Sequence, residues 1–489
     1  MIDTLQQLGI DYHFQEQIDE ALMRQYKDFI ASGEITNSDN EKNLCSTSIC
    51  FRLLRQNGHP VPSDVFNRFT DKHGKFRHHL STDLDGMIGL YQASLLGMEG
   101  EGILDLANAF TSVYLRGSAK KWSQHQARII KDIVDHPNHL TIARFNIKNV
   151  MKNQKSGVGS YDFNLQELAR MDFNIVQALH NAELQQLVKW CRDLGISRKL
   201  DFARDQPVKW YMWSMTILAD PMYTEERIDL TKCISFIYMM DDIFDVYGTL
   251  DELVLFDKAI NKWEVDTFEQ LSDPMKIYLK ALYKTTEEIS YKIFKKYGWN
   301  PISSIRKAWA RLCKAFLVEA KWFTSGHLPT SEEYLKNGMI SSGVDVLFVH
   351  IFFLLGQGIN KETIDLIENI PGLVSYPATI LRLWDDLGSS KDENQQGYDG
   401  SYIDCYMKEH VGADNDHARE NVRNMISNMW KKLNQEYVSS CPFPLSFKKA
   451  SLNTARMVRL MYSYDENQRL PMLEKHMKSV LYESIPPAE

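Results

Sequence analysis

The sequence lacks the features that mark several common classes of protein. It has seven cysteines, an odd number without any CxxC pair, which argues against a disulfide framework and against a cysteine-ligated zinc site. No basic stripe with interleaved aromatics appears and the net charge is −8, so we expect no nucleic-acid partner. Period-two alternation is scarce, and we find no uninterrupted apolar run long enough to span a bilayer.

The first residues carry neither a signal peptide nor an Arg- and Ser-rich transit peptide. The cysteine usage indicates a reducing compartment. For the chain as it stands we therefore expect a cytoplasmic location, with the plastid as the alternative if an N-terminal transit peptide has been removed. We also expect a monomer.

Apolar residues recur at helical spacing, which predicts an all-α protein. One such stripe is formed by Leu168, Met171, Ile175 and Leu179, with Gly195 as the expected stop. A length of 489 residues favours two domains, each large enough for its own core. The polar, glycine-rich stretch at 152–160 is the best linker candidate. We therefore predict two helical domains, at 1–160 and 161–489.

Two acidic runs, at 241–245 and 385–393, stand out from the rest of the chain. In a helix, residues four apart share one face. The side chains related in this way are Asp241 and Asp245 in the first run and Asp385, Ser389 and Glu393 in the second. Carboxylate and hydroxyl oxygens are the ligands that Mg²⁺ prefers, and such ions leave positions open for substrate phosphates.

An acidic run taken alone is most often a solvated helix face or a cap. Here the residues preceding the runs, 233–240 and 380–384, are almost entirely apolar, which predicts buried helices. Buried carboxylates need a partner, and a metal ion is the usual one. The context therefore favours functional sites over solvated faces.

The first run resembles the DDxxD motif of class I terpene synthases, and the second matches their (N/D)DxxSxxxE motif position by position. Further stretches are similar to plant members of the family, so that the resemblance extends along essentially the whole chain. These stretches are 8–14, 91–94, 320–323 and 409–410. The resemblance implies a non-catalytic N-terminal helical domain and a C-terminal class I terpenoid synthase helical bundle around the active site.

The resemblance also implies roles for single residues. Asp241 and Asp245 would bind two Mg²⁺ ions, and the residues of the second motif, Asp385, Ser389 and Glu393, would bind a third, with Mn²⁺ as an alternative metal. Arg204, at the first position of the family's RxR motif, and Arg382 would bind the diphosphate together with Asp385. Trp213 falls where the family keeps a pocket aromatic. The residues expected to act in catalysis are Asp241, Asp245, Arg204 and Trp213, while Asp242 would play a supporting role.

The departures from the family pattern concern charge and aromatic residues. Gln206 replaces the second arginine of RxR, and Gln396 replaces a basic residue after the second metal motif. The diphosphate would then be held with less charge, or Lys209 or Lys391 compensates. After Asp465 the usual pocket tyrosine is missing, which places ring closure in doubt.

Three other features of the sequence are expected to have mainly structural roles or are weaker candidates for the pocket. The segment 83–86 does not fit the DxDD pattern of protonation-initiated cyclases and is expected to cap a helix. The residues 341–344 lie where the family breaks a helix beside the pocket. Three further aromatics are weaker pocket candidates that fit the core equally well, namely Trp210, Phe236 and Phe323.

The pattern as a whole is similar to the linalool and nerolidol synthases, which make acyclic tertiary alcohols. It implies ionisation of geranyl or farnesyl diphosphate and capture of the cation by water at C3. A cyclising mono- or sesquiterpene synthase is the alternative. A chain-elongating isoprenyl-diphosphate enzyme would need a second aspartate-rich motif in place of Ser389 and Glu393. A helical scaffold would need internal repeats, which we do not find.

Overall fold

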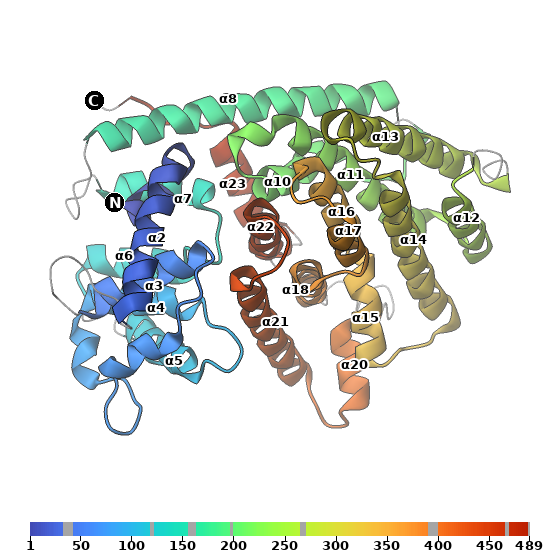
Figure 1. Ribbon diagram of the computed structural model, residues 1–489. Coiled ribbons are helices and arrows are strands. Elements are labelled where there is room, and N and C mark those ends of the chain that lie inside the picture. The colour runs from blue at the N-terminus through green and yellow to red at the C-terminus, as the bar shows by residue number, and fades with distance from the viewer. Residues whose placement is uncertain are drawn as a thin grey trace. The chain divides into compact units, whose positions relative to one another are not determined.

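The computed structural model describes residues 1–32, 43–117, 122–154, 163–195, 199–264, 270–389, 400–464 and 469–487. These residues form helices, and the single β-bridge among them joins Thr70 and Phe76. The predicted all-α class is confirmed (Figure 1). The contacts divide the chain into two compact units. Unit 1 comprises Met1–Gln177, Trp430–Cys441 and Lys478–Glu489, and unit 2 comprises Ala178–Met429 and Pro442–Met477.

The helices of unit 1 are α1 (Ile2–Gln7), α2 (Gln15–Ser32), α3 (Leu44–Gln56), α4 (Leu84–Ser94), α5 (Gly102–Gly117), α6 (Gln124–Asp135) and α7 (Ala143–Gln154). Three short 3₁₀ helices accompany them: η1 (Asp11–Phe14), η2 (Ser63–Phe69) and η3 (His78–Thr82). The predicted linker begins inside α7, and the predicted boundary at residue 160 lies outside the described residues.

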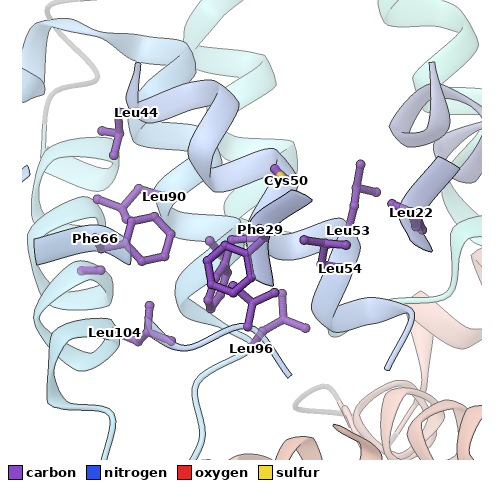
Figure 2. Close-up of a cluster of buried hydrophobic side chains, with 14 of the residues drawn as sticks. Leu22, Phe29, Leu44, Cys50, Leu53, Leu54, Phe66, Leu90, Leu96 and Leu104 are labelled. Carbon is purple, nitrogen blue, oxygen red and sulfur yellow. The ribbon is translucent and has the colours of Figure 1, made fainter. Parts of the chain in front are cut away.

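Leucine and phenylalanine side chains from α2 to α5 fill the core of unit 1. Figure 2 shows Phe29, Leu54, Phe66 and Leu90 within this cluster. Beside the core, the guanidinium of Arg55 is fully buried, and it donates hydrogen bonds to two backbone carbonyls and to Glu101. A charge can remain buried here because its donors are satisfied.

The acidic segment at the start of α4 is a helix cap. Asp83 is the N-cap residue, and its carboxylate accepts a hydrogen bond from the backbone N–H of Gly86 at 2.9 Å. This arrangement satisfies one of the unpaired donors at the helix start. The reading of residues 83–86 as a cap is therefore confirmed.

The helices of unit 2 are α10 (Pro207–Ile217), α11 (Thr224–Asp242), α12 (Leu250–Lys262), α13 (Asp273–Tyr297), α14 (Ile302–Ser325), α15 (Ser331–Ser341), α16 (Val344–Leu355), α17 (Lys361–Glu368), α18 (Gly372–Ser389), α20 (Tyr402–Glu409) and α22 (Leu445–Met461). Two short elements join them: η4 (Pro221–Tyr223) and the π-helical turn η5 (Ile243–Tyr247). Three helices contribute residues to both units: α8 (Phe163–Leu194), α21 (Asn415–Val438) and α23 (Pro471–Leu481).

The buried face of α8 differs from the predicted stripe. Met171 and Ile175 are exposed, whereas Phe173 and Val176 are buried. The spacing rule finds the helix but picks the wrong stripe, because Phe163–Leu194 carries apolar residues on more than one face. The helix ends at Leu194, and the following Gly195 has φ +65°, so the predicted stop is confirmed.

Every residue of α16 is buried, and most of α11 is buried as well. Helices α10, α14, α15, α18 and α22 pack around this pair in unit 2. The stretch Ser331–Leu355 is long and apolar enough to cross a membrane by composition, and 83% of its most apolar window is buried within the protein. A largely buried core helix passes the same test, and Gly343 interrupts the stretch, so it is weak evidence for a membrane span.

A buried ion pair fixes α11 to α8 within unit 2. Arg227 on α11 donates two hydrogen bonds to Glu183 on α8, at 2.9 and 2.6 Å, and both side chains are fully buried. The hydroxyl of Tyr211 on α10 donates to the same carboxylate at 2.7 Å. This network sets the position of α10 against α11, the two helices that carry Lys209 and Asp241.

Candidate active site

A cavity of about 160 Å³ lies among the helices of unit 2. Its charged lining consists of Arg204, Lys209, Asp241, Arg382 and Asp385. The remaining wall is largely apolar or aromatic and comes from α10, α11, α14, α15, α16, α18, α22 and the residues directly after α22. The two acidic motifs, 144 positions apart, thus contribute Asp241 and Asp385 to one cavity. An anionic head group and a hydrocarbon tail both find matching surfaces in it.

The first acidic run crosses the end of a helix. Helix α11 ends at Asp242, and Asp245 lies in the π-helical turn η5. The run is therefore helical, but only its first part is regular α-helix. A π-helical turn is rare and often marks a functional site, because it changes the direction of a side chain without ending the helix.

The carboxyl group of Asp245 is in an electrostatically unfavourable place. Burial raises its pKa to about 8, with further increases from the negative charges of Asp241 and Glu319. Its side chain nevertheless keeps access to solvent, and no hydrogen bond or ion pair joins it to the other described residues. Carboxylates that repel one another and remain accessible are suited to a divalent cation, which would offset their charge. The donor set of Asp241 and Asp245 therefore fits Mg²⁺.

Glu319 on α14 is an acid of this site that the sequence analysis missed. It accepts hydrogen bonds from Ser341 Oγ at 2.6 Å and Asn337 Nδ2 at 3.0 Å, and burial raises its pKa. Its position in the sequence could have indicated it, because Glu319 directly precedes the stretch 320–323 that resembles the family. The negative charges of Glu319 and Asp241 act on each other, which places α14 beside the first acidic run.

Arg204 is held by the first acidic run. Its guanidinium forms ion pairs with Asp241 and, at 2.6 Å, with Asp242, and its backbone N–H donates to Asp242 Oδ2 at 2.8 Å. Its guanidinium carbon also lies 5.3 Å from the ring centroid of Tyr238, one turn before Asp241. The structure therefore brings Arg204 and the first motif together, and it gives Asp242 a supporting role.

The second acidic run begins on α18. Arg382 donates to Asp385 at 3.2 Å and to Ser341 Oγ at 3.0 Å. The buried Asp386 accepts hydrogen bonds from the hydroxyl of Tyr334 and the backbone of Tyr402, and burial raises its pKa to about 7. Asp386 on α18 thus links this helix to α15 and to the start of α20, whereas Asp385 lines the cavity.

Part of the second metal motif cannot be placed. Ser389 is the last residue of α18, and Glu393 and Gln396 lie outside the described residues. In the part of the chain that the structure describes, no group of three His, Cys, Asp or Glu side chains is arranged to hold a metal ion. Two carboxylates per ion suffice for Mg²⁺, since it keeps water and phosphate oxygens as its other ligands.

The aromatic predictions divide into two groups. Trp213 lines the cavity, and its indole Nε1 donates to the hydroxyl of Tyr238 at 3.1 Å. Trp210 and Phe236 are fully buried away from the lining, and Phe323 is 67% exposed, so none of these three is a pocket residue. Trp213 was distinguished only by its fixed offset from Arg204.

The predicted helix break beside the pocket is present. Helix α15 ends at Ser341 and α16 begins at Val344, with Gly343 at φ +74° between them. A Cβ atom on Gly343 would come within 2.6 Å of Ile237 on α11, so both the backbone and the packing require glycine. The break places Ser341 and Ser342 in the cavity wall.

A tyrosine lines the cavity near the C-terminal end of unit 2, although the one expected after Asp465 is missing. Tyr464 and Tyr462 both belong to the lining. They pack closely on the end of α18, where a Cβ atom on Gly388 would lie 2.7 Å from Tyr462 O and 2.9 Å from the Tyr464 ring. The wall therefore has aromatic side chains here, although the tyrosine after Asp465 is missing from the sequence.

Comparison with known proteins gives close relatives over nearly the whole chain. A probable terpene synthase of Ricinus communis is 51% identical, over 99% of this chain and 84% of its own length. An (E)-nerolidol synthase of Cannabis sativa is 48% identical over 98% of this chain and 88% of its own. An S-(+)-linalool synthase of Arabidopsis thaliana is 46% identical, over 98% and 83%. A tricyclene synthase of Antirrhinum majus is 43% identical, over 98% and 82%.

A solved structure shares the fold. Isoprene synthase from grey poplar, in complex with three Mg²⁺ ions and dimethylallyl-S-thiolodiphosphate, matches with a TM-score of 0.93 and 34% identity, over 100% of this chain and 92% of its own. Family models also match two segments. Residues 1–136 match the terpene synthase N-terminal domain, and residues 192–432 match the metal-binding domain of the terpene synthase family. The chain therefore belongs to the terpene synthase family.

Proposed function

We propose that this enzyme ionises geranyl or farnesyl diphosphate and adds water at C3, giving linalool or (E)-nerolidol. The observation that carries the proposal is that one cavity is lined both by charged side chains and by aromatic and hydroxyl-bearing side chains. The nerolidol and linalool synthases among the relatives support the same product class. The substrate class is supported by the diphosphate analogue named with the isoprene synthase structure.

The first step breaks the C1–O bond of the substrate, and its electron pair leaves with the diphosphate. Arg204 and Arg382 line the cavity and can donate charge-assisted hydrogen bonds to the departing group. Mg²⁺ bound by Asp241 and Asp245, and by Asp385 with Ser389 and Glu393, would supply the main compensation of charge on the diphosphate oxygens. Asp242 keeps Arg204 in place beside this group.

The second step forms a bond between a water oxygen and C3 of the allylic cation, and the water loses a proton to solvent or to the released diphosphate. Hydroxyl groups of Ser342, Thr454 and Tyr464 line the cavity and can hold such a water molecule. The ring faces of Trp213 and Phe316, in the same lining, stabilise positive charge on the hydrocarbon.

A cyclising synthase is the second candidate, and one observation favours it. Tyr464 supplies an aromatic side chain to the cavity wall, although the tyrosine after Asp465 is missing, and such a wall could fold the hydrocarbon tail. The tricyclene synthase among the relatives is consistent with this alternative. The identity of the product separates the two candidates.

Incubation of the purified protein and Mg²⁺ with geranyl and farnesyl diphosphate, in separate reactions, tests the proposal by gas chromatography and mass spectrometry. We expect linalool from the first substrate and (E)-nerolidol from the second. Mainly cyclic products would favour the cyclising alternative, and no volatile product from either substrate would contradict both candidates. A chelator control should abolish turnover.

The location of the protein in the cell decides which substrate it meets, and we propose the cytoplasm. In that compartment farnesyl diphosphate is the expected pool and nerolidol the expected product. Fusion of the product of the full native transcript to a fluorescent protein tests this. Import into plastids would make linalool the physiological product instead.

A further inference from the structure

Lys209 is a charged residue of the cavity, and the sequence left open whether it or Lys391 compensates for the missing arginine. It lies in the first turn of α10, three residues after Gln206, and its side chain is half-buried. It shares the cavity lining with Arg204, Asp241, Arg382 and Asp385. The lining therefore has three cationic side chains and two carboxylates.

The other two cations of the lining are already paired with carboxylates. Arg204 forms ion pairs with Asp241 and Asp242, and Arg382 forms one with Asp385. In contrast, none of the ion pairs or hydrogen bonds among the described residues involves Lys209. Its Nζ instead lies 5.8 Å from the ring centroid of Tyr238.

Two cations lie near the ring of Tyr238, and the charge of one acts on the other. Arg204 Cζ lies 5.3 Å and Lys209 Nζ 5.8 Å from its centroid, and the hydroxyl of Tyr238 is fixed by Trp213. Desolvation and the charge of Arg204 lower the pKa of Lys209, while Asp385 opposes them. A half-buried ammonium group next to another cation is costly, and an anion placed between the two would remove that cost.

We propose that Lys209 binds the diphosphate of the substrate and supplies the charge that Gln206 lacks. The inference rests on the proposed function, because it assigns a residue to the same site. A lysine ammonium is a compact charge that can donate to more than one phosphate oxygen. Gln206 is exposed at the N-cap of α10 and makes no side-chain capping bond, while Lys209, three residues later, lines the cavity.

Three properties of diphosphate fit this position. It is an anion, so it attracts Lys209 and Arg204 together, and its charge on the leaving oxygen increases as the C1–O bond breaks. Its oxygens can also share metal ions with Asp241 and Asp385, which line the same cavity. A contact with the Tyr238 ring alone would leave Lys209 without an anionic partner.

The test compares Lys209→Gln, Lys209→Met and Lys209→Arg with the wild-type protein. A matched control is Lys280→Gln, which changes an exposed lysine on α13. Isothermal titration with inorganic pyrophosphate and Mg²⁺ measures affinity, and steady-state kinetics measures kcat and KM. We expect the two neutral variants to lose about 10- to 100-fold in pyrophosphate affinity and in kcat/KM, as for the loss of a hydrogen bond to a charged group.

The arginine variant should keep a substantial part of the affinity, and the Lys280 control should equal wild type. The methionine variant retains the aliphatic stem, so it tests the charge even if the glutamine variant folds poorly. Wild-type pyrophosphate affinity in a folded neutral variant, or no pyrophosphate binding by the wild-type protein, would overturn the proposal. A wild-type protein that binds pyrophosphate but yields no terpene would instead contradict the proposed function and leave the assignment of Lys209 standing.

Discussion

Arg204 is bound to Asp242 through both its backbone and its side chain. The backbone N–H donates to Oδ2 at 2.8 Å, and Nε lies 2.6 Å from Oδ1. Asp242 is itself buried, whereas the neighbouring Asp241 lines the cavity. A metal ion at Asp241 would compete with Arg204 for that carboxylate, and Asp242 would then keep the arginine in place.

Replacement of Asp242 by alanine should therefore impair catalysis without removing a metal ligand. We expect kcat/KM to fall by about 10- to 100-fold, the usual effect of losing hydrogen bonds between charged groups. Steady-state kinetics over a range of Mg²⁺ concentrations provides the measurement. The Mg²⁺ dependence should stay close to wild type, and a large increase in the Mg²⁺ requirement would instead indicate that Asp242 is a ligand.

The proposed metal ligands should behave differently. Asp241→Ala, Asp245→Ala and Glu393→Ala should each lower turnover by about 10³-fold or more, because charge on the leaving diphosphate is then no longer offset. The far-UV circular dichroism should remain that of a helical protein. Asp273→Ala, at an exposed position on α13, is the matched control. Activity near wild type in any of the three variants would refute that ligand.

The fold class and much of the site could be predicted from the sequence because their signals are local. Helical spacing gives the helices, and a motif of fixed spacing gives Asp241 and Asp385. The π-helical turn η5 could not be predicted, since the residues 243–247 fit an ordinary helix equally well. Its presence depends on packing that no short stretch of sequence encodes.

The contribution of Glu319, Lys209 and Tyr464 to the cavity depends on contacts between distant helices. Each residue taken alone fits a solvated face or a core position. Lys209 and Tyr464 come from distant segments to line one cavity, and the charge of Glu319 on α14 acts on Asp241 and Asp245 of the first acidic run. The same holds for unit 1, which takes in Trp430–Cys441 and Lys478–Glu489 from the far end of the chain. The spacing of apolar residues along one segment carries no information on which distant segments of the chain pack against it.

Gly338 on α15 should be essential for the position of Arg382. A Cβ atom at this glycine would lie 2.9 Å from Arg382 Cγ and 3.1 Å from its Nε. In a helix, Gly→Ala alone would stabilise by about 1 kcal/mol. We therefore expect Gly338→Ala to lower kcat/KM by about tenfold with little loss of thermal stability. The control is Gly102→Ala in α5. A Cβ atom at Gly102 would have no neighbouring atom within 4 Å, so the kinetics should be unchanged.

Acid should destabilise unit 2 through His350, which is fully buried on α16. Burial lowers the pKa of His350 from 6.5 to about 4. Below pH 6.5 the unfolded chain takes up a proton that the folded protein does not, so stability falls as the pH drops from 6.5 to 4. The loss should reach about 3 kcal/mol at pH 4.

Urea unfolding at several pH values, compared between wild type and His350→Gln, measures this contribution. The variant loses the hydrogen bond from His350 to Val346 O and should be less stable at pH 7. Its stability should, however, decline less steeply between pH 6.5 and 4. Parallel pH profiles for the two proteins would show that His350 titrates normally.

The neutral side chains at positions 206 and 396 offer a reason for an acyclic product. If neutral glutamines at 206 and 396 weaken the grip on departed diphosphate, water reaches C3 before the diphosphate returns. Restoring charge with Gln206→Arg and Gln396→Arg should then favour return of the diphosphate to C3 and isomerisation toward conformers that cyclise. We expect a measurable cyclic fraction from geranyl diphosphate, such as α-terpineol, at lower total turnover.

The control for charge is Gln206→Glu, which should lower the rate without adding cyclic product. Lys209 extends the experiment, because under the inference above it adds to the charge around the diphosphate and its removal lowers that charge. Combining the two arginines with Lys209→Gln should therefore give less cyclic product than the two arginines alone. If the double arginine variant still yields only linalool, the shape of the wall formed by Trp213, Phe316 and Tyr464 determines the product, and the charge around the diphosphate does not.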